Sequence, residues 1–390
     1  MKIKKYVMLL LVLMLILTST ACGGTAAPAA TSEAPAASAE APVQSSAPAP
    51  SVAAAGDATE IEEITDADTT GYELKPGDWA IGLSNSYYGN TWRKQMVDNF
   101  NETAEEAKAE GLLGSYEVQN GDNTVNAQLS QMNSFILKGV DAICVNAVSP
   151  TALNSVIKKA YDAGIKVIAF DSTVTSPYAY TIDFDFISYG EGAVDSVAKI
   201  AGEKSKVIIV RGVSGSAPDE QMYAGNLIAL ERYPDMEVVA TVNGEASATK
   251  AQEEITKILP SLTQVDGVVT QGGGDAYGVA QAFEQSTLKT PVIIGDNSAE
   301  FIQWWLQKKA SEGYETASQG STPSISSAAL WVSLYILNGC EVPTKMMCQY
   351  YKTDQSNVEE FADLTPGTIV SPSFTREYVV EKVIKPYILK

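Results

Sequence analysis

Short apolar runs alternate with segments of helical periodicity from about residue 78 onward. The apolar runs, each typical of a buried strand, cover residues 80–84, 116–119, 142–146, 166–170, 207–211, 238–242, 267–270 and 292–295. Between them, apolar side chains recur at helical spacing in residues 91–110, 124–138, 151–163, 188–201, 219–232, 248–259, 277–286 and 298–309. Strict strand–helix alternation with nearly continuous apolar strands predicts parallel sheets covered by helices on both faces.

The alternation pauses at residues 180–189 and then repeats. A chain of 390 residues also exceeds what one hydrophobic core usually holds. We therefore expect an α/β fold with two doubly wound parallel-sheet lobes. The pause places the predicted lobe boundary near residue 184.

The chain begins with a targeting segment. Three lysines precede an apolar run at residues 6–17, and small residues then lead to Cys22. This order resembles a bacterial lipoprotein signal, which predicts a signal peptide over residues 1–21 and lipidation of Cys22. Ser19 departs from that pattern, because Leu, Val or Ile usually stands three residues before the cysteine. The alternative is ordinary secretion with a free thiol at Cys22.

Residues 22–70 are rich in Ala, Pro, Ser and Thr and contain acidic residues but no Lys or Arg. Such a composition cannot bury enough apolar surface to offset its ordering entropy. We expect a disordered linker that holds the lobes away from a membrane or wall.

Two features of the composition reduce the number of function classes that fit this chain. The formal charge of −20 excludes nucleic acid as a partner, because few phosphates could be neutralised. Histidine is absent, which removes the usual general base and the commonest transition-metal ligand. We expect no metal and no cofactor. Two glycine-rich runs, GVSGSAPDE and QGGGDAYG, lack the Gly-Lys-Ser/Thr of a phosphate loop.

Polar side chains end several of the predicted strands. Asn146, Asp171 and Asp296 directly follow apolar runs, and Asp275 follows three glycines. In a doubly wound sheet, ligands bind beyond the carboxyl ends of the strands. Carboxylates accept hydrogen bonds from neighbouring hydroxyls, and amides both donate and accept. These residues therefore suit an uncharged, polyhydroxylated ligand.

The loop after the first strand adds Tyr87, Asn90 and Trp92 as further candidates, and the aromatic rings of Tyr87 and Trp92 suit the C–H face of a sugar. Each candidate also has a purely structural interpretation. Asp296 and Asn146 could cap the next helix, Trp92 could pack in the core with Met96 and Phe100, and Asp275 could serve its own turn.

Taken together, GLSNSYYGNTW, GVDAICVNAVSP, AGIKVIAFDS, GVVTQGGGDAYG and TPVIIGDNS resemble the ribose- and galactose-binding family of bacterial solute receptors, the type 1 periplasmic binding proteins. The resemblance spans about residues 79–343. It implies two lobes joined by a three-strand hinge, with a sugar bound in the cleft between them. With such a hinge, the first lobe is predicted to comprise residues 78–184 with 321–345, and the second residues 185–320 with 346–390. The ligand contacts that it implies are Asn90, Trp92, Asn146, Asp171, Asp275 and Asp296.

The sequence departs from this family at positions that affect ligand choice. Ser172 and the Asp219–Glu220 region stand where arginines are common, and Arg93 stands where a second aromatic residue is common. Gln319 or Ser321, in the crossing segment SQGSTP, could also reach the cleft. Cys340 and Cys348 flank a short loop in an exported protein, so we predict a possible disulfide.

The sequence predicts an extracytoplasmic, lipid-anchored, monomeric lipoprotein that binds a monosaccharide or polyol by hinge closure and delivers it to an ABC permease. A sensor of the same fold that signals to a kinase or chemoreceptor remains an alternative. A carboxylate-pair glycosidase is the enzymatic alternative, with Asp171 and Asp296 or Asp183 and Asp185 as acid and base. We expect binding without catalysis.

Overall fold

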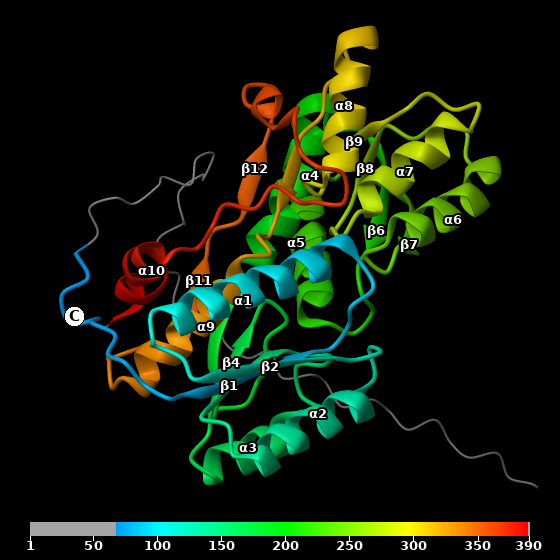
Figure 1. Cartoon of the computed structure of the whole chain (residues 1–390). Coiled ribbons are helices and arrows are strands. Elements are labelled where there is room, and N and C mark those ends of the chain that lie inside the picture. The colour runs from blue at the N-terminus through cyan, green and yellow to red at the C-terminus, as the bar shows by residue number, and fades with distance from the viewer. Residues whose placement is uncertain (1–67, 389–390) are drawn as a thin grey trace, which may run out of the picture. The chain divides into compact units, whose positions relative to one another are not determined.

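The computed structural model describes residues 68–388 (Figure 1). The predicted signal peptide, the lipidation site Cys22 and the linker as far as residue 67 lie outside the described residues. Within the part described, no helix is both long and apolar enough to span a membrane.

The first sheet has six parallel strands in the order β11-β5-β4-β3-β1-β2. The strands are β1 (Ala80–Asn85), β2 (Ser115–Asn120), β3 (Ala142–Asn146), β4 (Lys166–Phe170), β5 (Tyr180–Phe184) and β11 (Lys345–Cys348). Helices α1 (Thr91–Ala109) and α9 (Ile325–Leu337) pack on one face, and α2 (Val125–Lys138) and α3 (Asn154–Asp162) pack on the other. Both faces are buried, as the apolar strands predict.

The second sheet has four parallel strands in the order β7-β6-β8-β9. These are β6 (Lys206–Arg211), β7 (Glu237–Asn243), β8 (Gly267–Val269) and β9 (Val292–Ile294). Helices α4 (Phe186–Ala201) and α5 (Ala217–Arg232) cover one face, and α6 (Ala248–Ile258), α7 (Asp275–Glu284) and α8 (Ala299–Glu312) cover the other. Next to β9, β10 (Ser318–Gly320) pairs antiparallel with β12 (Tyr351–Thr353).

Three segments connect the lobes where the resemblance places the hinge. They join β5 to α4, β10 to α9 and β11 to β12. Two doubly wound lobes and their connections confirm the predicted fold class. Strands β5, β10 and β12 had no clear sequence signal, because each is short and interrupted by polar residues.

The predicted lobe boundary near the C-terminus needs correction. Strand β11 pairs with β5 and belongs to the first lobe. Residues beyond 370 also return to the first lobe, where the side chains of Phe374, Tyr378 and Val380 are buried in its core beside α9. Phe374 and Tyr378 stack with ring centroids 4.5 Å apart. Burial of these apolar side chains stabilises the packing of the C-terminal residues against the first lobe.

The predicted disulfide is also absent, because Cys340 and Cys348 are free thiols. Cys340 lies just after α9, whereas Cys348 is the last residue of β11. An extended strand rises about 3.3 Å per residue, so β11 carries Cys348 away from the loop. The Cys348 side chain is buried in the first lobe, where burial raises the pKa of its thiol.

Candidate functional site

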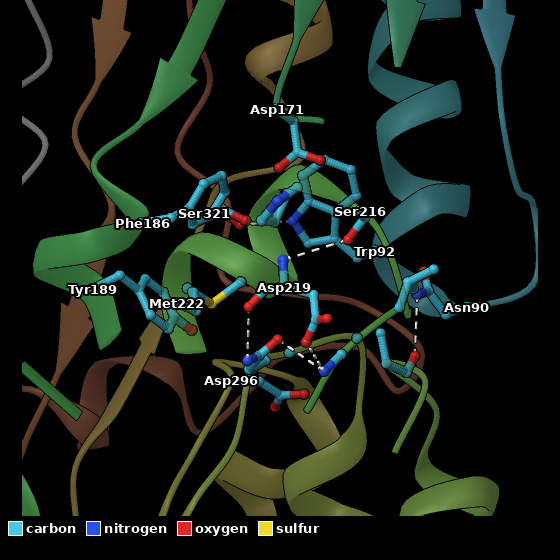
Figure 2. A pocket seen from close by; sticks show the side chains of 18 of the residues that line it. Asn90, Trp92, Asp171, Phe186, Tyr189, Ser216, Asp219, Met222, Asp296 and Ser321 are labelled. Carbon is cyan, nitrogen blue, oxygen red and sulfur yellow. Dashed lines mark hydrogen bonds between the residues drawn. The ribbon is translucent and has the colours of Figure 1, made fainter. Parts of the chain in front are cut away.

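A cavity lies between the two lobes, at the carboxyl ends of both parallel sheets (Figure 2). Its volume is about 80 Å³, enough for several water molecules, since one water needs about 10–15 Å³ by this measure. At its edge the Asn90 side chain donates a hydrogen bond of 3.1 Å from the first lobe to the carbonyl of Ala246 in the second. The lobes therefore contact each other beside the cavity, which suits a small ligand.

The N-terminus of α1 supplies three cavity residues. Asn90 caps the helix by accepting a hydrogen bond of 2.8 Å from the Arg93 backbone N–H. The indole of Trp92 donates to the carbonyl of Ser321 at 2.7 Å, which fixes the ring beside a hinge segment. The Arg93 side chain turns inward and is almost fully buried.

Arg93, Asn146 and Asp171 form a buried polar network. The Arg93 guanidinium donates to the side-chain oxygen of Asn146, and the Asn146 amide donates to Asp171 Oδ2 at 3.1 Å. Arg93 Nη2 lies 4.0 Å from the same carboxylate. Burial raises the pKa of Asp171, and the charge of Arg93 opposes that rise. Burial likewise lowers the pKa of Arg93, which Asp171 opposes.

The second lobe supplies Asp296, which follows β9. Its Oδ1 accepts from the backbone N–H of Ser298 at 3.2 Å and from the Ser298 hydroxyl at 2.7 Å, and its Oδ2 accepts from Gly274 N–H. Asp275 lies close behind it, and no salt bridge involving either carboxylate occurs within residues 68–388. Burial raises the pKa of both carboxyls, and the negative charge of Asp296 raises the pKa of Asp275 further.

A salt bridge forms another wall of the cavity. Arg211 contacts Asp219 through two hydrogen bonds, Nε to Oδ1 at 3.0 Å and Nη2 to Oδ2 at 2.6 Å. Asp219 lines the cavity, while Arg211 stands behind it with its guanidinium over the Tyr223 ring. Asp219 thus replaces the arginine that the resemblance led us to expect in this region.

Apolar side chains line the rest of the cavity. They are those of Trp92, Phe186, Tyr189 and Met222, which come from both lobes (Figure 2). The Tyr189 hydroxyl donates to the Gln319 carbonyl at 2.7 Å. Aromatic faces beside hydrogen-bonding carboxylates match a ligand with both C–H and O–H surfaces.

Four of the eight predicted ligand residues line this cavity, namely Asn90, Trp92, Asp171 and Asp296. Asn90 and Trp92 come from the N-terminus of α1, Asp171 follows β4 and Asp296 follows β9, and the four side chains meet at this cavity. Whether they contact a ligand remains a prediction.

The other four do not line the cavity, and their contact with a ligand also remains a prediction. Asn146 is fully buried behind Asp171. The Asp275 carboxylate holds its own turn, accepting from the backbone N–H groups of Gln271 at 3.0 Å and Gly272 at 3.1 Å. Tyr87 lies outside the cavity, in a bridge to Asp122. Gln319 bonds the Tyr189 backbone at 2.7 Å in the hinge.

Several lining residues were missed as ligand candidates. Arg93, Phe186, Tyr189 and Met222 sit on helices at apolar or mixed positions, where sequence gives no sign that they face a cavity. Ser321, expected as a possible cleft residue, does line it.

Of the carboxylate pairs considered for catalysis, Asp183 and Asp185 are arranged differently from a paired acid and base. Asp183 accepts from Thr173 Oγ1 at 2.9 Å, and enclosure raises its pKa to about 7. Asp185 caps α4 by accepting from the Ser188 N–H at 3.0 Å. Neither lines the cavity. Over the described part of the chain, no group of three potential metal ligands is present.

Comparisons with known proteins agree with this architecture. The chain is 27% identical over 225 residues to a xylitol-binding protein of Mycolicibacterium smegmatis, covering 57% of this chain and 64% of that protein. It is 23% identical over 310 residues to a galactofuranose-binding protein of Escherichia coli, covering 77% and 91%. The alignment with the xylitol-binding protein thus spans under two thirds of that relative's length.

A solved ABC transporter solute-binding protein from Thermobispora bispora superposes with a TM-score of 0.73 at 36% identity, covering 79% of this chain and 95% of that one. The periplasmic binding protein domain family matches residues 81–341, about two thirds of the sequence. The chain therefore belongs to the periplasmic binding protein family.

Proposed function

We propose that this protein is an extracytoplasmic receptor that binds a monosaccharide or a related polyol. The observation that carries the proposal is the cavity between the lobes, which is lined by a carboxylate from each lobe, Asp171 from the first and Asp296 from the second. Ionised carboxylates accept hydrogen bonds from hydroxyl groups strongly, and a polyol presents such groups on all sides. The relatives named for xylitol and galactofuranose support this ligand class.

Binding would act through lobe closure. Because the cavity takes its walls from both lobes, a ligand makes its full set of contacts only in the closed form. Ligand binding therefore shifts the population from open to closed. The closed form is what a membrane permease of an ABC importer would recognise, and Cys22 would anchor the receptor by its lipid. No turnover of the ligand is part of this proposal.

Calorimetric titration with a panel of pentoses, hexoses and polyols tests the proposal. We expect stoichiometric binding of at least one neutral member. Asp171→Ala and Asp296→Ala should each weaken it by ten- to a hundredfold, since each removes charge-assisted hydrogen bonds. Asp162→Ala is the control, because Asp162 pairs with Lys158 on the exposed face of α3 and does not line the cavity. Equal loss in all three variants, or none, would contradict this placement of the site.

A further inference from the structure

The chain crosses between the lobes a fourth time, in addition to the three hinge connections. The C-terminal segment passes between α8 of the second lobe and α1 of the first (Figure 1). We call residues 367–374 the strap. It is buried at its centre, where Ile369 is 2% exposed.

The first half of the strap is fixed to the second lobe, beside the loop that carries Asp296. The backbone N–H of Ala299 donates to the Thr368 carbonyl at 2.8 Å, and Val370 N–H donates to the Asn297 carbonyl at 2.9 Å. Ser298 and Ile369 form an antiparallel bridge. These backbone contacts attach this half to the Asp296 loop, while the Ile369 side chain is buried in the same hydrophobic cluster as α1 and α9.

The second half is fixed to the first lobe. The Ser324 hydroxyl donates to the Pro372 carbonyl at the start of α9. Phe374 is buried in the first core, and Arg376 pairs with Glu110 at 2.8 Å. Only two residue steps separate Val370 from Pro372, and they span at most about 7 Å even when extended. The strap thus limits how far the lobes can separate at this side of the cleft.

A polar side chain of the first lobe, Gln95, also bonds the half of the strap that is attached to the second lobe. Gln95, one turn after Trp92 on α1, accepts from the Ile369 N–H at 2.7 Å and donates to the Ile369 carbonyl at 3.1 Å. Gln95 does not line the cavity. These two hydrogen bonds join the helix carrying Asn90 and Trp92 to the loop carrying Asp296.

We propose that the strap and its Gln95–Ile369 contact form an inter-lobe latch that favours the closed receptor and so sets its affinity. Gln95 is a positioning residue in this role, acting on the ligand only through closure. When the lobes open, the Gln95 amide and the Ile369 backbone separate and each is hydrated. When they close, the contact re-forms beside the ligand loops.

The test compares Gln95→Leu with Gln303→Leu in the full mature chain. Gln303 of α8 donates to the Leu364 carbonyl at 2.8 Å, so it also bonds the C-terminal segment, but within the second lobe. Calorimetry with the tightest-binding polyol of the panel gives the affinity, and small-angle X-ray scattering without ligand gives the radius of gyration. The affinity measurement rests on the proposed function, whereas the scattering measurement does not.

We expect Gln95→Leu to weaken binding by about ten- to a hundredfold, the range for losing two hydrogen bonds, and to enlarge the ligand-free protein. Gln303→Leu should leave both unchanged. If Gln95→Leu matches Gln303→Leu in affinity and in radius, the latch is refuted. If Gln95→Leu does not fold, Gln95→Glu, which keeps the acceptor and loses the donor, gives the same comparison. If no polyol binds the wild type, the proposed ligand fails and scattering alone decides the latch.

Discussion

The network of Arg93, Asn146 and Asp171 provides the sharpest prediction for stability. We consider Arg93→Met, which keeps a long side chain but removes the guanidinium. The substitution leaves the Asp171 carboxylate buried at 5% exposure and without the cation that now lies 4.0 Å away. The side-chain oxygen of Asn146 also loses the hydrogen bond that it accepts from the Arg93 guanidinium.

The expected magnitude follows from the burial of both partners. Breaking a buried pair by removing one member destabilises by about 3–5 kcal/mol, whereas replacing both charges by neutral groups has little effect. Asp171→Asn should cost less, about 1–3 kcal/mol, because Arg93 keeps Asn85 and Asn146 as acceptors. The double variant should be less destabilised than the sum of the two single variants by at least about 1.5 kcal/mol.

Urea unfolding without ligand, followed by circular dichroism, measures these free energies of unfolding. Loss of Arg93 also raises the pKa of Asp171 further, since the positive charge now opposes the effect of burial. Above about pH 4 the Asp171 carboxyl is ionised in the unfolded chain, whereas the folded protein disfavours the ionised form. The free energy of unfolding therefore decreases as the pH rises above about 4. The destabilisation by Arg93→Met should therefore grow from pH 5 to pH 8.

Two results would refute this reasoning. If the single effects add to the double effect within about 0.5 kcal/mol, Arg93 and Asp171 are not coupled. If the loss is the same at pH 5 and pH 8, Asp171 does not carry the penalty. Lys94→Met is the control, because Lys94 is an exposed neighbour on the same helix and should change stability by less than about 0.5 kcal/mol.

Three further predictions concern single residues. Burial raises the pKa of Asp183 to about 7, so the free energy of unfolding of the wild type should fall from about pH 4 to pH 7, where Asp183 is ionised only in the unfolded chain. Asp183→Asn should remove this fall, which amounts to up to about 4 kcal/mol at pH 8 in thermal or urea unfolding. Identical pH profiles of the two proteins would contradict the burial of Asp183. Asn90→Ala removes the hydrogen bond to Ala246 across the cleft, so stopped-flow fluorescence should show ligand dissociating several-fold faster, whereas a slower or equal rate would argue against closure there. Cys340 is half-buried while Cys144 and Cys348 are buried, so Cys340→Ser should abolish rapid labelling of the folded lobes by a thiol reagent; persistence of fast labelling at either buried thiol would contradict the packing.

The fold was predictable because its signals are local. Strand β3 is apolar at every position but the last, and α2 repeats its apolar residues at helical spacing between the cap Thr124 and Gly139. Such patterns need no knowledge of distant residues. The return of residues 371–388 to the first lobe was not predictable, since the sequence around Phe374 and Tyr378 does not indicate which core buries them. Only the tertiary structure decides between two apolar surfaces.

The site was half predictable for a related reason. A polar residue at a strand end can face the ligand or serve the backbone, and both uses have the same sequence. Asp296 reaches the cavity, whereas Asp275 follows three glycines of positive φ and accepts from the turn that they form. Those glycines leave backbone N–H groups without helix or sheet partners, and a carboxylate four residues on can reach them. The Asp275 carboxylate therefore stabilises the turn and does not face the cavity.

Arg93 shows why the charge of the cavity could not be deduced from its most evident residues. The guanidinium comes from α1, yet its partners Asn146 and Asp171 end β3 and β4. Nothing within ten residues of Asp171 on either side supplies a positive charge except Lys166, on the opposite end of β4. A cation placed beside a strand-end acid by a different element balances it as well as an adjacent arginine would. The absence of arginine at Ser172 therefore changes the source of the positive charge and leaves its presence at Asp171 intact.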